Sequence, residues 1–66
     1  MMSDAARDLL LSLRRTADGV KYQACHGADL KAAHELEDLG MALWKGNSFG
    51  SNFYCITEAG IKELEK

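Results

Sequence analysis

Four side chains in this sequence are of types that bind zinc, namely Cys25, His26, His34 and Cys55. Protein zinc sites use thiolate and imidazole ligands, and short motifs place about two to four residues or more between the members of a ligand pair. Cys25 and His26 are adjacent, so the spacing does not fit such a motif. We therefore expect neither a metal ion nor another cofactor.

The same residues do not predict an enzyme. Side chains of neighbouring residues usually diverge, so Cys25 and His26 do not form a nucleophile and base within hydrogen-bond reach. Gly46 and Gly50 are not followed by the start of a helix, as a phosphate-binding loop would be. A chain of 66 residues also has little room for a substrate pocket of several hundred cubic ångströms.

Composition is typical of one small globular domain spanning residues 1–66, with 47% hydrophobic and 27% charged residues. No apolar run approaches the roughly 18 residues that predict a membrane span. The charged, amphipathic start is unlike a signal peptide. We expect a cytoplasmic protein without membrane contact. Its two cysteines would be reduced and buried, and a single disulfide is the alternative.

Two helices are predicted from apolar residues at helical spacing. Ser3 can cap a first helix that ends near Ala17, and its buried stripe is Ala6, Leu9, Leu10 and Leu13. Asp29 is the expected N-cap of a second helix, which Gly40 ends in the left-handed conformation. The buried residues expected in this second helix are Ala32, Ala33, Leu36 and Leu39.

The segment between these helices has two interpretations. Val20, Tyr22 and Ala24 alternate as in a strand, yet the run from Val20 to His26 is short enough to be a turn or two of helix. The sequence leaves both open, and Gly27 breaks whichever element forms.

Two aromatic and apolar runs, Met41 to Lys45 and Phe53 to Thr57, are typical of strands. The residues from Lys45 to Asn52 are rich in Gly, Asn and Ser, which predicts a hairpin with a long, flexible tip. Thr57 is expected to cap a final helix. Because a lone hairpin is marginal in water, it must pack against the helices.

Two short segments at the ends of this hairpin carry a family resemblance. They are Leu36-Glu37-Asp38-Leu39-Gly40-Met41 and Ile56-Thr57-Glu58-Ala59-Gly60. The first resembles the junction between recognition helix and wing in the winged helix-turn-helix family, and the second resembles the entry to the closing helix. The resemblance implies an α+β fold: a small three-helix winged helix-turn-helix domain with a two-stranded β-hairpin wing and a short C-terminal helix. The departure from the family pattern is Val20 to Gly27.

In that family the second helix of the motif enters the major groove of DNA, and the wing contacts the backbone or the minor groove. The resemblance therefore implies a DNA-associated, transcription-regulatory protein with duplex DNA as its partner. By position, the implied contacts come from the second helix and from the wing: Lys31, His34, Glu35 and Asp38, then Lys45, Asn47, Ser48, Ser51 and Asn52.

Charge opposes the DNA interpretation. The chain has a formal net charge of −2, and the second helix carries one lysine against four acidic residues. Affinity for DNA comes largely from neutralised phosphates, so Arg7, Arg14, Arg15 and Lys21 would have to help. One alternative for the charges is a plain solvated helix face.

The other alternative is a protein-interaction module that uses the acidic helix together with Trp44 and Phe49, since interfaces favour aromatic anchors. Phe49 either folds back on the hairpin or stays exposed as such an anchor. We expect Tyr54 to pack against the helices. Homodimerisation is a further expectation, because so small a core gains from covering apolar surface.

Overall fold

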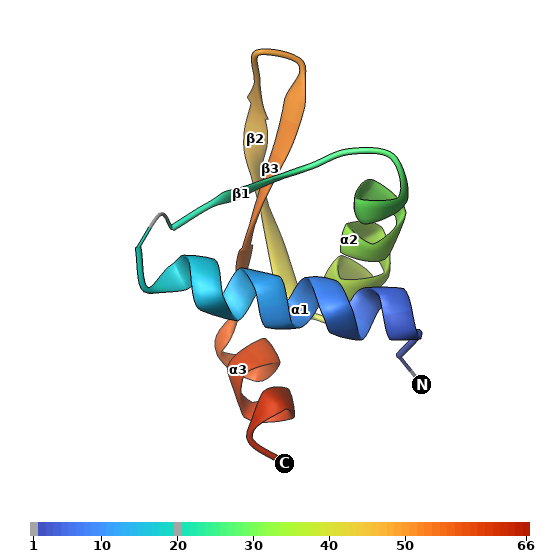
Figure 1. The fold of residues 1–66 in the computed structure, drawn as a ribbon, viewed down its shortest axis with the longest axis vertical. Coiled ribbons are helices and arrows are strands. Elements are labelled where there is room, and N and C mark those ends of the chain that lie inside the picture. The colour runs from blue at the N-terminus through green and yellow to red at the C-terminus, as the bar shows by residue number, and fades with distance from the viewer. Residues whose placement is uncertain (1, 20) are drawn as a thin grey trace.

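The computed structural model describes residues 2–19 and 21–66, so Val20 lies outside the described residues. The elements are α1 (Asp4–Ala17), β1 (Gln23–Cys25), α2 (Ala28–Asp38), β2 (Ala42–Ser48), β3 (Ser51–Ile56) and α3 (Glu58–Leu64). Within these residues the fold is α+β, with three helices and an antiparallel sheet of strand order β1-β3-β2 (Figure 1). The predicted class and helices are confirmed, and the sheet has one strand more than the predicted hairpin.

Capping and a single apolar stripe account for α1. The Ser3 hydroxyl accepts a hydrogen bond from the Ala6 N–H at 3.1 Å, as an N-cap does. The apolar stripe predicted for this helix is buried in full: Ala6, Leu9, Leu10 and Leu13. In Figure 1, α1 crosses the base of the β2–β3 hairpin, with α3 below it. The first helix, α1, is therefore the element against which the other elements pack.

The start of α2 differs from the prediction. The N-cap is Gly27, at φ 54°, and Asp29 lies inside the first turn, so the predicted N-cap at Asp29 is wrong. Glycine adopts a positive φ without steric cost, which lets the chain turn into the helix earlier. Leu39 was expected to be buried but is 43% exposed. The reason is that α2 ends at Asp38 and Leu39 is the C-cap.

Gly40 ends α2 as predicted, at φ 76°. The Gly40 N–H donates to the Glu37 carbonyl at 3.0 Å, and the Met41 N–H donates to the Leu36 carbonyl at 2.8 Å. These two bonds form a Schellman motif, which satisfies carbonyls that the end of a helix would otherwise leave unpaired. The chain then enters β2 directly.

The hairpin turn is much shorter than predicted. Asn47 pairs with Asn52 and Ser48 pairs with Ser51, so the turn contains only Phe49 and Gly50 and the prediction of a long tip is wrong. Both turn residues have a positive φ, 53° and 77°, as tight two-residue hairpin turns require. Gly, Asn and Ser thus lie in the strands, because their pairing satisfies backbone groups that a long loop would leave to water.

A β-bulge interrupts β2. The register shifts between Trp44, which pairs with Tyr54, and Asn47. Lys45 and Gly46 therefore lie together opposite a single residue of β3. Gly46 has φ 114°, a conformation that side chains rarely adopt, so glycine accommodates the extra residue.

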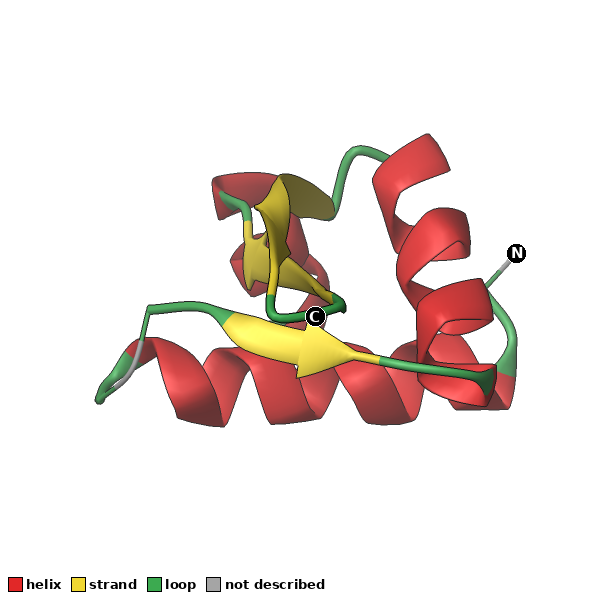
Figure 2. Ribbon diagram, turned by 90° about the horizontal axis from the view of Figure 1, so that it is seen from above, coloured by secondary structure: helices red, strands yellow, loops and turns green. Residues whose placement is uncertain are grey.

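The ambiguous segment after α1 forms a strand. β1 pairs antiparallel with β3, with Ala24 opposite Phe53. Figure 2 shows from above that β1 runs alongside α1. Side-chain hydrogen bonds join the two elements, because the Gln23 amide oxygen accepts from the Ser12 hydroxyl at 2.8 Å and from the Thr16 hydroxyl at 3.0 Å. The strand interpretation is confirmed for this part of the segment.

The sheet has two different faces, because side chains alternate along a strand. Tyr54 and Cys25 lie on the inner face, in the core with the helices, and are only 2% and 1% exposed. We call the opposite side the outer sheet face; its side chains come from β1, β2, β3 and the residue before β1, namely Tyr22, Ala24, Leu43, Lys45, Phe53 and Cys55.

Both cysteines are free. Cys25 is buried as predicted, but Cys55 is only half-buried, so the prediction of burial is wrong for Cys55, which lies on the outer sheet face. Within residues 2–19 and 21–66, no helix has the length and apolar character needed to cross a membrane.

Gly60 is the position in α3 where a side chain does not fit. A Cβ there would lie 2.6 Å from the Met41 carbonyl oxygen and 2.7 Å from Ile56 Cγ1. We expect Gly60→Ala to lower the free energy of unfolding by about 1–3 kcal/mol, because a backbone carbonyl cannot move aside cheaply. Chemical denaturation measures this. Gly19→Ala is the control, since no atom lies within 4 Å of its Cβ position; equal stability losses in both variants would contradict the packing argument.

Candidate functional site

The outward surface of α2 carries part of the predicted site. Lys31, His34 and Asp38 are exposed, whereas the opposite side of the helix is buried in the core. This arrangement follows from the helical repeat, which separates these polar residues from Ala32, Ala33 and Leu36. The exposed surface of α2 is still acidic, because Asp29, Glu37 and Asp38 are exposed beside the single Lys31.

Glu35 has a structural partner. Its carboxylate accepts a hydrogen bond from the Ser3 backbone N–H at 2.7 Å and another from the Ser3 hydroxyl at 2.8 Å. These two bonds, the backbone one first, lower the pKa of Glu35 below its usual value. Glu35 therefore connects α2 to the N-terminus of α1, and both of its oxygens are engaged before any ligand arrives.

The polar residues of the hairpin are partly engaged with one another. The side-chain oxygen of Asn52 accepts from Trp44 Nε1 at 3.1 Å and from Asn47 Nδ2 at 3.3 Å. Asn47 and Ser48 are exposed, and Asn52 is half-buried. The arrangement leaves the Asn47 side-chain oxygen and the Ser48 hydroxyl to reach a partner at the end of the hairpin.

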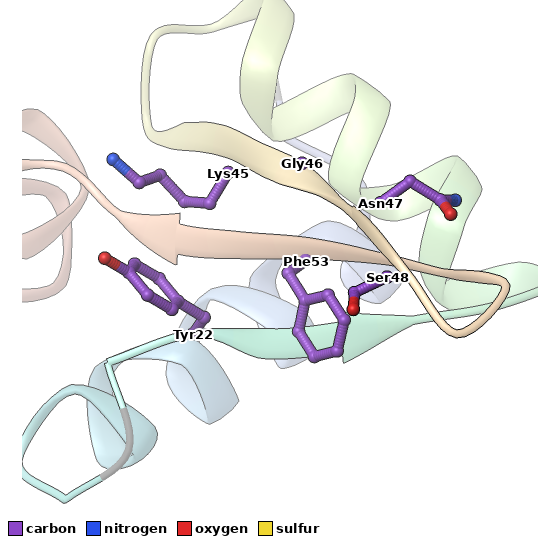
Figure 3. Close-up of a pocket in the computed structure, with 6 residues that line it drawn as sticks. All are labelled: Tyr22, Lys45, Gly46, Asn47, Ser48 and Phe53. Atoms are coloured by element: carbon purple, nitrogen blue, oxygen red, sulfur yellow. The ribbon is translucent and has the colours of Figure 1, made fainter.

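Lys45 lies on the other side of the sheet from these asparagines. Its ammonium group lies over the ring of Tyr22, 5.6 Å from the ring centroid, in a cation–π arrangement. Figure 3 shows the Lys45, Tyr22 and Phe53 side chains on one side of the sheet and Asn47 directed away from them. Because α2 packs on the inner face, the structure does not bring Lys45 together with Lys31 and His34.

Phe49 is fully exposed at the hairpin tip, with a relative accessibility of 102%. The interpretation in which it folds back on the hairpin is therefore wrong. The backbone of Phe49 adopts a left-handed φ of 53° in the two-residue turn. A non-glycine residue with positive φ is uncommon and costs conformational energy. Trp44 is 49% exposed, whereas Tyr54 is buried as expected.

The basic residues outside α2 are partly committed to ion pairs. Arg7 lies 3.7 Å from Glu63 of α3, and Arg14 lies 3.1 Å from Asp18 at the end of α1. Lys21 lines a hollow beside Tyr22 and Lys45 on the outer sheet face. Arg7 and Arg14 therefore already have acidic partners within the chain, and Lys21 lies with Lys45 on the outer sheet face, away from α2.

The cysteines and histidines are not gathered into a metal site. Across the described part of the chain, no three His, Cys, Asp or Glu side chains are placed to hold a metal ion together. Cys25 points into the core, where burial and then the charge of Asp29 raise the pKa of its thiol. The Nε2 atom of His26 instead lies 3.3 Å from the Ser51 hydroxyl.

Sequence reasoning missed Tyr22 and Phe53 as members of a surface with Lys45. They line adjoining hollows of about 300 and 340 Å³, which share Tyr22 and Lys45 (Figure 3). The sequence signal for this surface is the alternation that places Tyr22 and Ala24 on the same side of a strand. The alternation alone does not identify Phe53 as a neighbour, because only the pairing of β1 with β3 sets Tyr22 and Phe53 on one face.

Comparison of the chain with family models, curated proteins and solved structures found no match.

The Glu35–Ser3 contact generates a pH-dependent prediction. A carboxyl with a lowered folded-state pKa contributes stability above its unfolded pKa of about 4.3, and this contribution is lost as the pH falls through the folded value. We expect Glu35→Gln to destabilise the protein at neutral pH, and the difference from the wild type to shrink below about pH 4. Urea denaturation at several pH values measures it. Glu65→Gln is the control, and a pH-independent Glu35 effect would contradict this role for the charge.

The tip of the hairpin generates a second prediction. Phe49→Ala should leave stability within about 0.5 kcal/mol of the wild type, since an exposed side chain contributes little packing. Phe49→Asn should raise the free energy of unfolding by about 0.5–1 kcal/mol, because asparagine tolerates a positive φ. Thermal and urea denaturation measure both. A large loss of stability in Phe49→Ala would mean that this residue belongs to the core.

Proposed function

We propose that this protein is a small winged-helix-like module that associates with duplex DNA in transcription regulation. The observation that carries the proposal is the β2–β3 hairpin. It leaves the end of α2 through Gly40, stands beyond the helices and ends in an unpacked tip, as a wing would (Figure 1). The sequence resemblance at Leu36 to Met41 and at Ile56 to Gly60 supports the same assignment.

The contacts proposed for DNA come from α2 and from the hairpin end. Lys31 and His34 are the exposed donors of α2, and Asn47 and Ser48 are exposed near the tip. Glu35 opposes a phosphate less than an unpaired carboxylate would, because two donors of Ser3 already satisfy its oxygens. Asp38 remains exposed and weakens the attraction, so the proposed affinity is modest and depends on the few donors present.

A protein-interaction role is the second candidate. It is favoured by the exposure of Phe49 and by Leu43 and Trp44 of β2, which are 50% and 49% exposed. Residues of this kind act as anchors in protein interfaces. In this role the acidic surface of α2 would bind a basic partner, and the same negative charge would keep α2 from contacting DNA.

Titration with labelled duplex DNA tests the first proposal. At about 50 mM salt we expect binding that weakens as salt rises, with a slope near −0.9 for each phosphate contact. Lys31→Glu should lower the affinity about tenfold or more, because it replaces a phosphate partner by a repelling charge. Asp38→Asn should raise the affinity, because it removes an exposed opposing carboxylate.

Lys62→Glu is the matched control, since it makes the same charge change on α3, at the end of the molecule away from the hairpin tip (Figure 1). An equal loss in both lysine variants would indicate only a general charge effect and would count against the α2 contact. Absence of duplex binding by the wild type at about 50 mM salt would overturn the DNA proposal and favour the interaction role.

A further inference from the structure

The outer sheet face combines aromatic rings with positive charge. Tyr22 is 43% exposed and Phe53 is half-buried, and both rings lie on this face beside Lys45 (Figure 3). The adjoining hollows of about 300 and 340 Å³ run along it and share Tyr22 and Lys45. We call the two hollows together the groove. Besides the shared Tyr22 and Lys45, one hollow is lined by Gly46, Asn47, Ser48 and Phe53, and the other by Ala17, Lys21, Cys55 and Ile56.

The charge of this groove is opposite to that of the chain. Lys21 and Lys45 are the charged residues that line the two hollows within the described residues, and no acidic side chain lines either of them. The chain as a whole has a formal net charge of −2, and α2 is acidic. The groove therefore carries local positive charge on a protein whose net charge is negative.

We propose that the outer sheet face binds single-stranded nucleic acid, with bases stacked on Tyr22 and Phe53 and the phosphate backbone beside Lys21 and Lys45. Proteins that bind single strands combine these features, namely a basic groove that follows the backbone and aromatic rings that stack on successive bases. This site is separate from the α2 surface proposed for duplex DNA, because α2 packs on the inner face of the sheet. The two proposals share only the hairpin residues Asn47 and Ser48, which line one of the two hollows.

The geometry favours unpaired bases over a duplex. The aromatic rings lie on the sheet surface rather than at a protruding edge, so a base reaches them only when its own face is free to stack. Lys45 already lies over the Tyr22 ring, 5.6 Å from its centroid, and can turn to a phosphate while the ring receives a base. The exposure of Tyr22 means that the ring needs no movement of the core to do so.

Fluorescence anisotropy with a labelled oligothymidine of about 16 nucleotides tests this site at about 50 mM salt. We expect binding by the wild type that weakens with salt. Tyr22→Leu, which keeps an apolar side chain and removes the ring, should lower the affinity about fivefold or more. Lys21→Gln should lower the affinity and reduce the salt slope by about 0.7, the share of one single-strand phosphate contact.

Lys31→Gln and Phe49→Ala are the matched controls, because they remove a lysine of α2 and an aromatic ring of the hairpin tip outside the groove. They should leave oligothymidine binding unchanged. Circular dichroism checks that each variant is folded. In the wild type, backbone amide shifts on titration should cluster at Tyr22, Lys45 and Phe53, which supports the site without any substitution.

Four results would overturn the proposal: no binding of oligothymidine by the wild type, equal losses in Lys31→Gln and Lys21→Gln, tighter binding of the matching duplex through the groove residues, or shifts that avoid the groove. Thymidine monophosphate serves as a further arm, and binding as tight as that of the oligonucleotide would assign the groove to a free nucleotide instead. A dimer that Tyr22→Leu dissociates would assign it to a second copy of the chain.

Discussion

The place where α2, β2 and α3 meet depends on a small group of hydrogen bonds between Thr57 and the backbone of Gly40, Met41 and Gly60. The Thr57 hydroxyl donates to the Gly40 carbonyl at 2.7 Å, and the Thr57 N–H donates to the Met41 carbonyl at 3.1 Å. The same hydroxyl accepts from the Gly60 N–H at 3.2 Å and so caps α3. One threonine thus joins the end of one helix to the start of another, while the hairpin leaves between them. The two glycines are needed for different reasons, Gly40 for its positive φ and Gly60 for the approach of Met41.

Much of this arrangement could be predicted from local chemistry. The end of α2 at Gly40 and the cap at Thr57 follow from residue preferences within a few positions, and both predictions are confirmed. The predicted N-cap of α2 was wrong because both Gly27 and Asp29 suit the start of a helix, and local residue preferences do not distinguish between them. The short turn was missed for a related reason, since Gly46, Asn47 and Ser48 have low strand preference and are held in β2 by pairing with β3.

The candidate sites also differ in how much of each could be predicted from the local sequence. Lys31 and His34 could be placed from the helical repeat alone, because a helix sets its own exposed side. The groove could not be found in this way, since Tyr22 and Phe53 are far apart in the sequence and meet only through the register of β1 on β3. For Glu35, the position on the helix could be predicted but its hydrogen-bond partner could not. The repeat placed it outside the core, but its contact with Ser3 is made across the domain and depends on how α1 lies against α2.

The bulge in β2 explains why the hairpin has two chemically different faces. Trp44 lies on the inner side, so alternation places Lys45 on the outer sheet face. Without the extra residue, Asn47 would also point outward and could not donate to Asn52 on the inner side. The bulge therefore keeps the amide network of Trp44, Asn47 and Asn52 together while it leaves the lysine with Tyr22. The extra residue at Gly46 thus sets Asn47 and Lys45 on opposite faces of the hairpin, while Ser48 returns to the outer sheet face and lines the same hollow as Lys45.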